Sequence, residues 1–203
     1  MEIKGVLHVL RLARHNDAIV MSTSACRFMN LFPYTGYAAG TKHSYAGSGS
    51  EYLCLPEEPQ WKTYLEGHQS NTGRLAGVEY DLFNSGSARN NIFSERNNDG
   101  SPLQDNPAPC AVCYVQSRST VLMIPARTQC PDGWNVEYAG YLVSNHYTHK
   151  RSSFVCLDEV PEVATGAKAQ SQALFYPVEV ECGTLPCSLY VNGREITCVV
   201  CSK

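Results

Sequence analysis

The chain has 203 residues, a formal net charge of −3 and only 17% charged residues. This charge balance excludes a nucleic-acid-binding protein that works through a broad basic face, and no apolar run reaches the ~18–20 residues of a membrane-spanning helix. A hydrophobic content of 43% with twelve tyrosines excludes wholesale disorder. Ten cysteines remain to be explained. Their even number and the low charge favour a secreted, disulfide-bonded protein.

The start of the chain, residues 1–5, lacks the basic start and the apolar core of a signal peptide. Two interpretations stay open: a mature extracellular chain that begins near here behind an added methionine, or a cytosolic protein. The cysteine content favours the first. We therefore expect a secreted protein without a transmembrane segment.

Short strands are the predicted elements along the chain. Residues 6–12 and 119–124 are short, largely apolar runs, and residues 173–180 form a longer run that Pro177 interrupts. A proline cannot donate a ladder hydrogen bond, so this last run is expected at the edge of a sheet.

The clearest local signal lies near the end of the chain. Asn192-Gly193 separates two short β-type runs within residues 188–197, a pattern typical of a hairpin. No segment has apolar residues at helical spacing over three turns, so the sequence predicts a mostly β protein with little helix.

The second half of the chain repeats the first. Tyr34-Thr-Gly-Tyr recurs as Tyr138-Ala-Gly-Tyr, an offset of 104 residues (34 to 138) that also relates Cys26 to Cys130. Such repetition is the signature of a duplication. We predict two tandem β repeats that pack as one pseudo-symmetric, disulfide-stapled unit. The first covers residues 1–114, with a long polar loop at 84–109, and the second covers residues 115–203.

The repeat also groups the cysteines. Cys110 and Cys113 are expected to bond Cys26 and Cys54 in one order or the other, and the second copy is expected to follow the same scheme. All ten cysteines are predicted to be disulfide-bonded: Cys26, Cys54, Cys110, Cys113, Cys130, Cys156, Cys182, Cys187, Cys198 and Cys201. A Cys₄ zinc site built from the two C-x-x-C pairs is an alternative, and a redox C-x-x-C is another. We expect neither a bound metal nor a cofactor.

Several motifs resemble a known family. They include Tyr34-x-Gly-Tyr, the run Ser50-Glu-Tyr-Leu-Cys-Leu-Pro-x-x-Pro-x-Trp and the terminal run from Tyr190 to Lys203. Over essentially its whole length the chain resembles the globular module of sponge short-chain, spongin-type collagens and related secreted invertebrate proteins. It has no Gly-X-Y repeat and is not itself a collagen. It departs from the family at Tyr45, Gln104 and Asn106, where histidines are common, so a metal site built on those histidines is not expected here.

The resemblance implies an extracellular location and two possible functions. Some members of the family resemble lectins for galactosides or acidic sugars, and others resemble matrix proteins. We expect a secreted, non-catalytic lectin that binds glycans of the galactose or galacturonate type. A homodimer is the candidate assembly. The alternative is a structural module of the extracellular matrix or of cell adhesion, without sugar binding.

Polar recognition groups are densest in one short segment of the second repeat. Sugars need hydrogen-bonding side chains and an aromatic face, and a carboxylated sugar also needs arginine, which binds a carboxylate with two parallel bonds. The candidate ligand-binding residues are Asn145, His146, Tyr147, His149, Lys150 and Arg151, with Lys42, His43 and Tyr45 in the corresponding segment of the first repeat.

Two outcomes for these segments stay open: two unequal sites, or one stronger site in the second repeat. A plain solvated loop is the alternative to a site. On a strand, His146 and His149 would point to opposite faces, which disfavours zinc.

No catalytic residues are predicted. The chain has no Gly-x-Ser-x-Gly motif. Glu79 and Glu179 are related by the repeat and could be imagined as a glycosidase pair. As equivalent strand residues they are better explained as structural.

Overall fold

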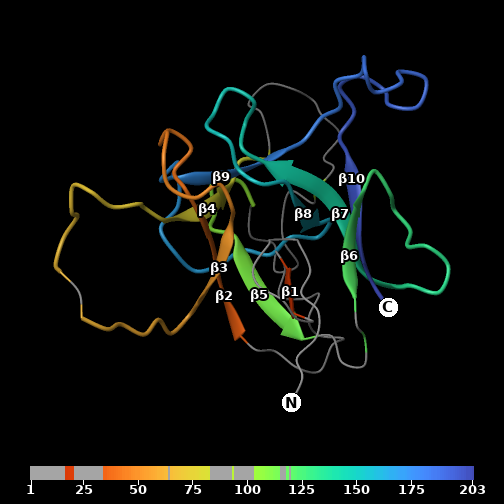
Figure 1. Cartoon of the computed structure of the whole chain (residues 1–203). Coiled ribbons are helices and arrows are strands. Elements are labelled where there is room, and N and C mark those ends of the chain that lie inside the picture. The colour runs from red at the N-terminus through yellow and green to blue at the C-terminus, as the bar shows by residue number, and fades with distance from the viewer. Residues whose placement is uncertain are drawn as a thin grey trace.

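The computed structural model describes residues 17–20, 34–63, 65–82, 93, 103–114, 118 and 120–203. The strand expected at residues 6–12, Cys26 and most of the polar loop 84–109 lie outside this part of the chain. Within the described part every regular element is a strand and none is a helix (Figure 1). The prediction of a mostly β protein is therefore confirmed.

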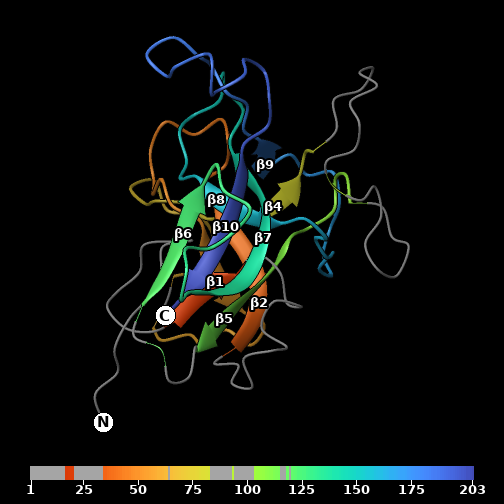
Figure 2. The ribbon, with the colours of Figure 1, turned by 90° about the vertical axis from the view of Figure 1, so that its right-hand side faces the viewer.

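Ten strands follow one another along the chain. They are β1 (Asp17–Val20), β2 (Tyr34–Gly40), β3 (Leu53–Pro56), β4 (Ala76–Tyr80), β5 (Pro109–Tyr114), β6 (Val121–Pro125), β7 (Asn135–Ser144), β8 (Val155–Asp158), β9 (Ala173–Pro177) and β10 (Thr197–Ser202). They join in the order β1-β5-β2-β4-β9-β7-β10-β6, with β3 paired to β2 and β8 to β7 (Figures 1 and 2).

The two halves of the chain make corresponding main-chain contacts. In the first half Gly36 lies opposite Cys110 in the β2–β5 ladder, and in the second half Gly140 lies opposite Cys198 in the β7–β10 ladder. Outside the strands, Ala108 N donates to Val78 O at 2.9 Å, and Ile196 N donates to Val178 O at 2.9 Å.

The repeated tyrosine-glycine motif has a physical reason. The hydroxyl of Tyr34 donates to Cys54 O at 3.0 Å, and that of Tyr138 donates to Cys156 O at 3.1 Å. Burial raises the pKa of Tyr138 well above its ordinary value, so the hydroxyl stays protonated and can donate.

The glycine of each motif lies against the neighbouring strand. A Cβ on Gly36 would lie 1.7 Å from Leu55 O, and one on Gly140 would lie 1.8 Å from Leu157 O. Only a residue without a side chain lets β3 approach β2, and β8 approach β7, this closely.

Disulfide bonds cross-link each half of the chain. The pairs are Cys54–Cys110, Cys130–Cys201, Cys156–Cys198 and Cys182–Cys187. Within the described residues the predicted scheme is confirmed, and the zinc and redox alternatives for the C-x-x-C pairs are wrong. Cys113 is disulfide-bonded as well; Cys26, its expected partner, lies outside the described residues.

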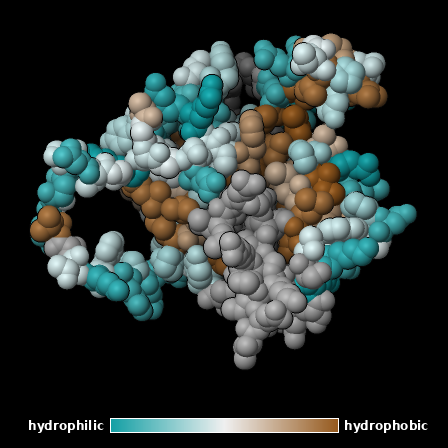
Figure 3. Space-filling model, in the orientation of Figure 1, coloured by the Kyte–Doolittle hydropathy of each residue, from teal (hydrophilic) through white to brown (hydrophobic). Residues whose placement is uncertain are grey.

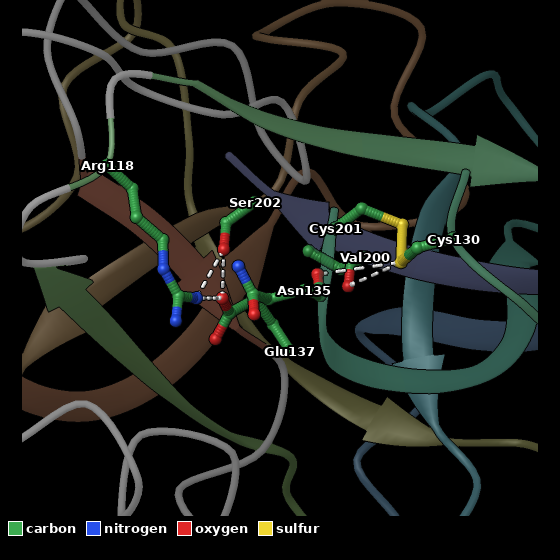
Figure 4. The surroundings of a disulfide bond; sticks show 7 residues. All are labelled: Arg118, Cys130, Asn135, Glu137, Val200, Cys201 and Ser202. Atoms are coloured by element: carbon green, nitrogen blue, oxygen red, sulfur yellow. Dashed lines mark hydrogen bonds and ion pairs between the residues drawn. A yellow bond between two sulfur atoms is a disulfide. The ribbon is translucent and has the colours of Figure 1, made fainter. Parts of the chain in front are cut away.

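A partly buried ion pair lies close to the Cys130–Cys201 disulfide (Figure 4). Glu137 is the extra residue of a bulge between β7 and β10, because Val200 lies opposite Tyr138 whereas Cys201 lies opposite Val136. The carboxylate of Glu137 is nearly buried, and it accepts hydrogen bonds from the Arg118 guanidinium and the Ser202 hydroxyl. The positive charge of Arg118 makes the burial of this carboxylate tolerable.

Both halves contribute to one core. The Tyr52 ring packs on Phe175 with centroids 4.8 Å apart, and the Tyr80 ring lies 6.3 Å from the same phenylalanine. Strand β4 of the first half also pairs in parallel with β9 of the second. The chain therefore packs as one unit. The expected boundary between residues 114 and 115 falls beside residues 115–117, which the structure does not describe.

Two strand predictions are wrong. Residues 173–177 form β9, which lies between β4 and β7 and not at an edge. Pro177 is the last residue of that strand. Proline has no N–H to donate, and at the end of a strand no later ladder hydrogen bond is lost because of it.

The hairpin expected at residues 188–197 is also absent. The Asn192-Gly193 turn exists, with Gly193 at φ +74°, but residues 188–191 form no strand. Instead, the residues after the turn bond to the segment that follows β9, where Val180 N donates to Arg194 O at 2.9 Å. Of the polar loop predicted at residues 84–109, the described residues 103–108 form no strand, Leu103 is fully buried, and Pro109 begins β5.

Candidate functional site

An open pocket of about 800 Å³ lies beside the loop that joins β7 to β8. This volume is in the range typical of small-molecule sites. All six candidate residues of the second repeat line it: Asn145, His146, Tyr147, His149, Lys150 and Arg151. The remaining walls come from the ends of β4 and β9 and from the segment around residues 178–181 and 192–193.

The loop that carries these residues is a tight turn. His149 N donates to His146 O at 2.8 Å, and the Asn145 side chain donates to Lys150 O at 2.8 Å. The expectation that a strand would send His146 and His149 to opposite faces is therefore wrong. Their rings lie on the same side, with centroids 5.3 Å apart.

A serine and a buried tyrosine anchor the base of this loop. The Ser152 hydroxyl accepts from Asn145 N at 3.1 Å and lies 2.9 Å from the hydroxyl of Tyr52 in the first half. That tyrosine also donates to Leu174 O at 2.9 Å. Burial raises the pKa of Tyr52, so its proton stays in place. The core thus holds the pocket loop in position.

The corresponding loop of the first half meets the pocket loop. Lys150 N donates to His43 O at 3.1 Å, and the rings of His43 and His149 have centroids 4.4 Å apart. Figures 1 and 2 show the loops after β2 and after β7 side by side. His43 thus ties the loop of the first half to the pocket loop, although it does not itself line the pocket.

None of the three candidates of the first repeat, Lys42, His43 and Tyr45, lines the pocket. The Lys42 ammonium lies 5.9 Å from the centre of the Tyr45 ring, and the Arg74 guanidinium lies 6.0 Å from it. These contacts are cation–π interactions at the surface. Lys42 and Tyr45 therefore form a separate cluster next to the site.

The pocket carries charge of both signs. Lys150 and Arg151 line it together with the carboxylates of Asp81, Glu179 and Glu181. The predictions from sequence missed Asp81, Glu181 and Tyr176. Nothing in the sequence marks them, because they reach the pocket only through the pairing of β4 with β9 and of β9 with β7.

Two of the pocket groups have shifted pKa values. Burial, and then hydrogen bonding and the negative charge of Asp81, raise the pKa of Tyr176. Burial, and then the neighbouring His43 and His146, lower the pKa of His149. At neutral pH the pocket thus presents a protonated phenol and an uncharged imidazole.

Aromatic side chains form part of the pocket rim. Tyr147 is 91% exposed and Phe154 is 60% exposed, and both line the pocket. The His146 ring contacts Tyr147 at a centroid distance of 4.4 Å and Tyr176 at 5.2 Å. Exposed rings next to hydrogen-bonding groups are the arrangement that sugar binding requires.

The carboxylate of Glu79 has a structural role. It is buried, and its two oxygens accept from Gln170 N at 2.8 Å and from Ser171 N at 2.9 Å. Glu179, its counterpart in the second repeat, lines the pocket instead. Glu79 is not among the pocket-lining residues, so the two glutamates do not face one another across this pocket.

Among the described residues no three or more His, Cys, Asp or Glu side chains are arranged to hold a metal ion, and no helix there is long and apolar enough to cross a membrane. The chain matches no known family model and no solved structure.

Proposed function

We propose that this protein is a secreted, non-catalytic lectin that binds galactosides or acidic, uronic-type sugars in the pocket beside the β7–β8 loop. The observation that carries the proposal is the convergence of all six candidate residues of that loop on one open pocket. The family resemblance of the sequence to spongin-type modules supports the same function.

The side chains of the pocket suit a carbohydrate. Carboxylates such as Asp81 accept hydrogen bonds from sugar hydroxyls, and the exposed Tyr147 ring can cover the apolar face of a sugar ring. Arg151 offers a planar fork that binds a sugar carboxylate with two bonds. The disulfides support the extracellular location, because such bonds persist in oxidising compartments.

One shared pocket has a consequence for avidity. Single sugar sites bind weakly, and linking several sites raises the overall affinity without new contacts. Since the six candidate residues of the β7–β8 loop converge on one pocket, a single chain would be monovalent here. The lectin hypothesis therefore includes a homodimer or a larger assembly.

Replacing Arg151 with alanine tests the proposal on a glycan array. Loss of the guanidinium removes a charge-assisted bond, so glycans ending in galacturonate should bind about tenfold more weakly. Neutral galactosides should lose less than about threefold. Arg127→Ala is the matched control, because Arg127 is exposed and does not line the pocket.

The array also separates the two candidate functions. No binding by a correctly folded wild-type protein would eliminate the lectin. Equal losses on acidic and neutral glycans would contradict the role of Arg151 as a carboxylate clamp.

One observation favours the alternative, a structural matrix or adhesion module. The loop between β3 and β4 projects from the sheet and carries Trp61, 76% exposed, and Leu65, 77% exposed (Figures 1 and 3). Exposed apolar side chains on a projecting loop are typical of contacts between proteins.

The matrix alternative predicts self-association through this loop. The double variant Trp61→Ser, Leu65→Ser should then sediment as a smaller species than the wild type. Leu189→Ser is the control, because Leu189 is equally exposed, at 76%, on a different loop. Identical sedimentation of all three proteins would remove the support for this alternative.

A further inference from the structure

Three histidine side chains meet where the two loops join. The rings of His43 and His149 have centroids 4.4 Å apart, and those of His146 and His149 are 5.3 Å apart. His43 belongs to the loop after β2, and the other two belong to the loop after β7. The ring of His149 therefore contacts a histidine on each loop.

Main-chain bonds complete this junction. Lys150 N donates to His43 O at 3.1 Å, and His43 N donates to Gln172 O at 3.0 Å. Beyond the histidines, Ser153 N donates to Ser50 O at 2.7 Å. The histidine rings thus lie at a contact that joins the two halves of the molecule at the edge of the pocket.

Several charged and titratable groups surround His149. The Tyr176 ring on β9 lies 5.6 Å from the His149 ring. The other groups that line the junction or the adjoining pocket are His43, His146, Lys150, Arg151, Asp81, Glu179 and Glu181. The negative charge of Asp81 opposes the lowering of the His149 pKa, but burial and the two other histidines outweigh it. One carboxylate can compensate one protonated ring but not two or three.

We propose that His43, His146 and His149 form a pH-sensitive latch between the two loops: the neutral rings pack and hold the loops together, and their protonation in acidic solution separates them and opens the edge of the pocket. Like charges on rings about 5 Å apart repel each other, whereas the neutral rings attract through their faces and edges. The latch follows from the ring contacts and does not require a sugar ligand.

The direction of the pH effect follows from linkage. Burial and the two other histidines lower the pKa of His149 in the folded protein. The open or unfolded state therefore takes up the proton more readily than the closed state. The junction has its full stability above the ordinary histidine pKa of about 6.5. It loses this stability as the pH falls through the lowered pKa of His149.

Amide exchange tests the latch in the intact protein. Exchange at residues 41–45 and 145–151, corrected for the intrinsic effect of pH, should become at least about fivefold faster between about pH 7.5 and pH 5, because the open state takes up the proton more readily than the closed state. Exchange within β10 should not change, which shows that the sheet stays folded.

Three variants complete the experiment. His149→Gln and His43→Gln should each reduce the acceleration to less than about twofold, because each removes one ring of the contact. His68→Gln should keep the full acceleration, since His68 is exposed on the loop between β3 and β4. Slow amide exchange within β10 at neutral pH shows that a variant is folded. If one of the two latch variants lacks this protection, the other, folded variant tests the latch.

Two results would overturn the latch. One is no acceleration in the wild type. The other is the same acceleration in the wild type and in a folded His149→Gln or His43→Gln variant.

Discussion

Replacing Gly140 with alanine should destabilise the protein by at least about 3 kcal/mol. The added Cβ would lie 1.8 Å from Leu157 O and 2.8 Å from Glu159 N, and both atoms belong to the backbone. Backbone atoms cannot rotate away as the end of a side chain can, so β8 would have to separate from β7. Urea unfolding followed by tyrosine and tryptophan fluorescence measures the change in the free energy of unfolding.

Gly77→Ala is the matched control for this prediction. Gly77 lies in β4, and an added Cβ there would meet nothing within 4 Å. Its expected effect is less than about 1 kcal/mol, because alanine also reduces the conformational freedom of the unfolded chain. A Gly140→Ala protein as stable as Gly77→Ala would show that the close approach of β7 and β8 is unimportant.

Removing the Cys156–Cys198 disulfide is the second change with a large expected effect. The bond closes a segment of 42 residues, and both cysteines are fully buried. Loop-closure entropy alone predicts a loss of about 4 kcal/mol for the double variant Cys156→Ala, Cys198→Ala. The melting temperature by calorimetry and the midpoint of urea unfolding both measure it.

The Cys182–Cys187 disulfide provides the comparison. It closes a segment of only five residues in an exposed loop, so its removal should cost about 2 kcal/mol or less. The two double variants should therefore differ clearly in stability. Equal losses would contradict the assignment of Cys156–Cys198 as a main support of the second half.

Much of the framework could be predicted from the repeat in the sequence. The repeat predicted that Cys54 bonds one cysteine of the first C-x-x-C pair and Cys156 one cysteine of the second pair, and the bonds Cys54–Cys110 and Cys156–Cys198 agree with this. The prediction depended on matching the cysteines of the two halves in order along the chain, which needs no knowledge of tertiary contacts. The role of the glycine in each Tyr-x-Gly-Tyr motif could not be predicted, because it depends on the carbonyl of a neighbouring strand.

The candidate site was only partly predictable for the same reason. Composition singled out residues 145–151, because recognition groups cluster there along the chain. The contact between His43 and His149 joins residues more than 100 positions apart, and a repeat shows which residues correspond, not which ones touch. Asp81 and Tyr176 were missed because the pairing of β9 with β4 and β7 brings them to the pocket.

Local patterns failed where distant contacts prevailed. The Asn192-Gly193 turn formed as predicted, but residues 194–196 bond to residues 178–180 and not to residues 188–191. Likewise, Pro177 ends a strand that lies inside the sheet. Both outcomes show tertiary pairing overriding a local preference.

A crystal structure of the protein soaked with galactose or galacturonate tests the central claim most directly. The lectin hypothesis predicts a sugar ring in the pocket beside the β7–β8 loop, with Tyr147 against its apolar face. For galacturonate it also predicts the sugar carboxylate on the guanidinium of Arg151. A sugar bound elsewhere, or an empty pocket in crystals soaked above the concentration that saturates binding in solution, would contradict the account.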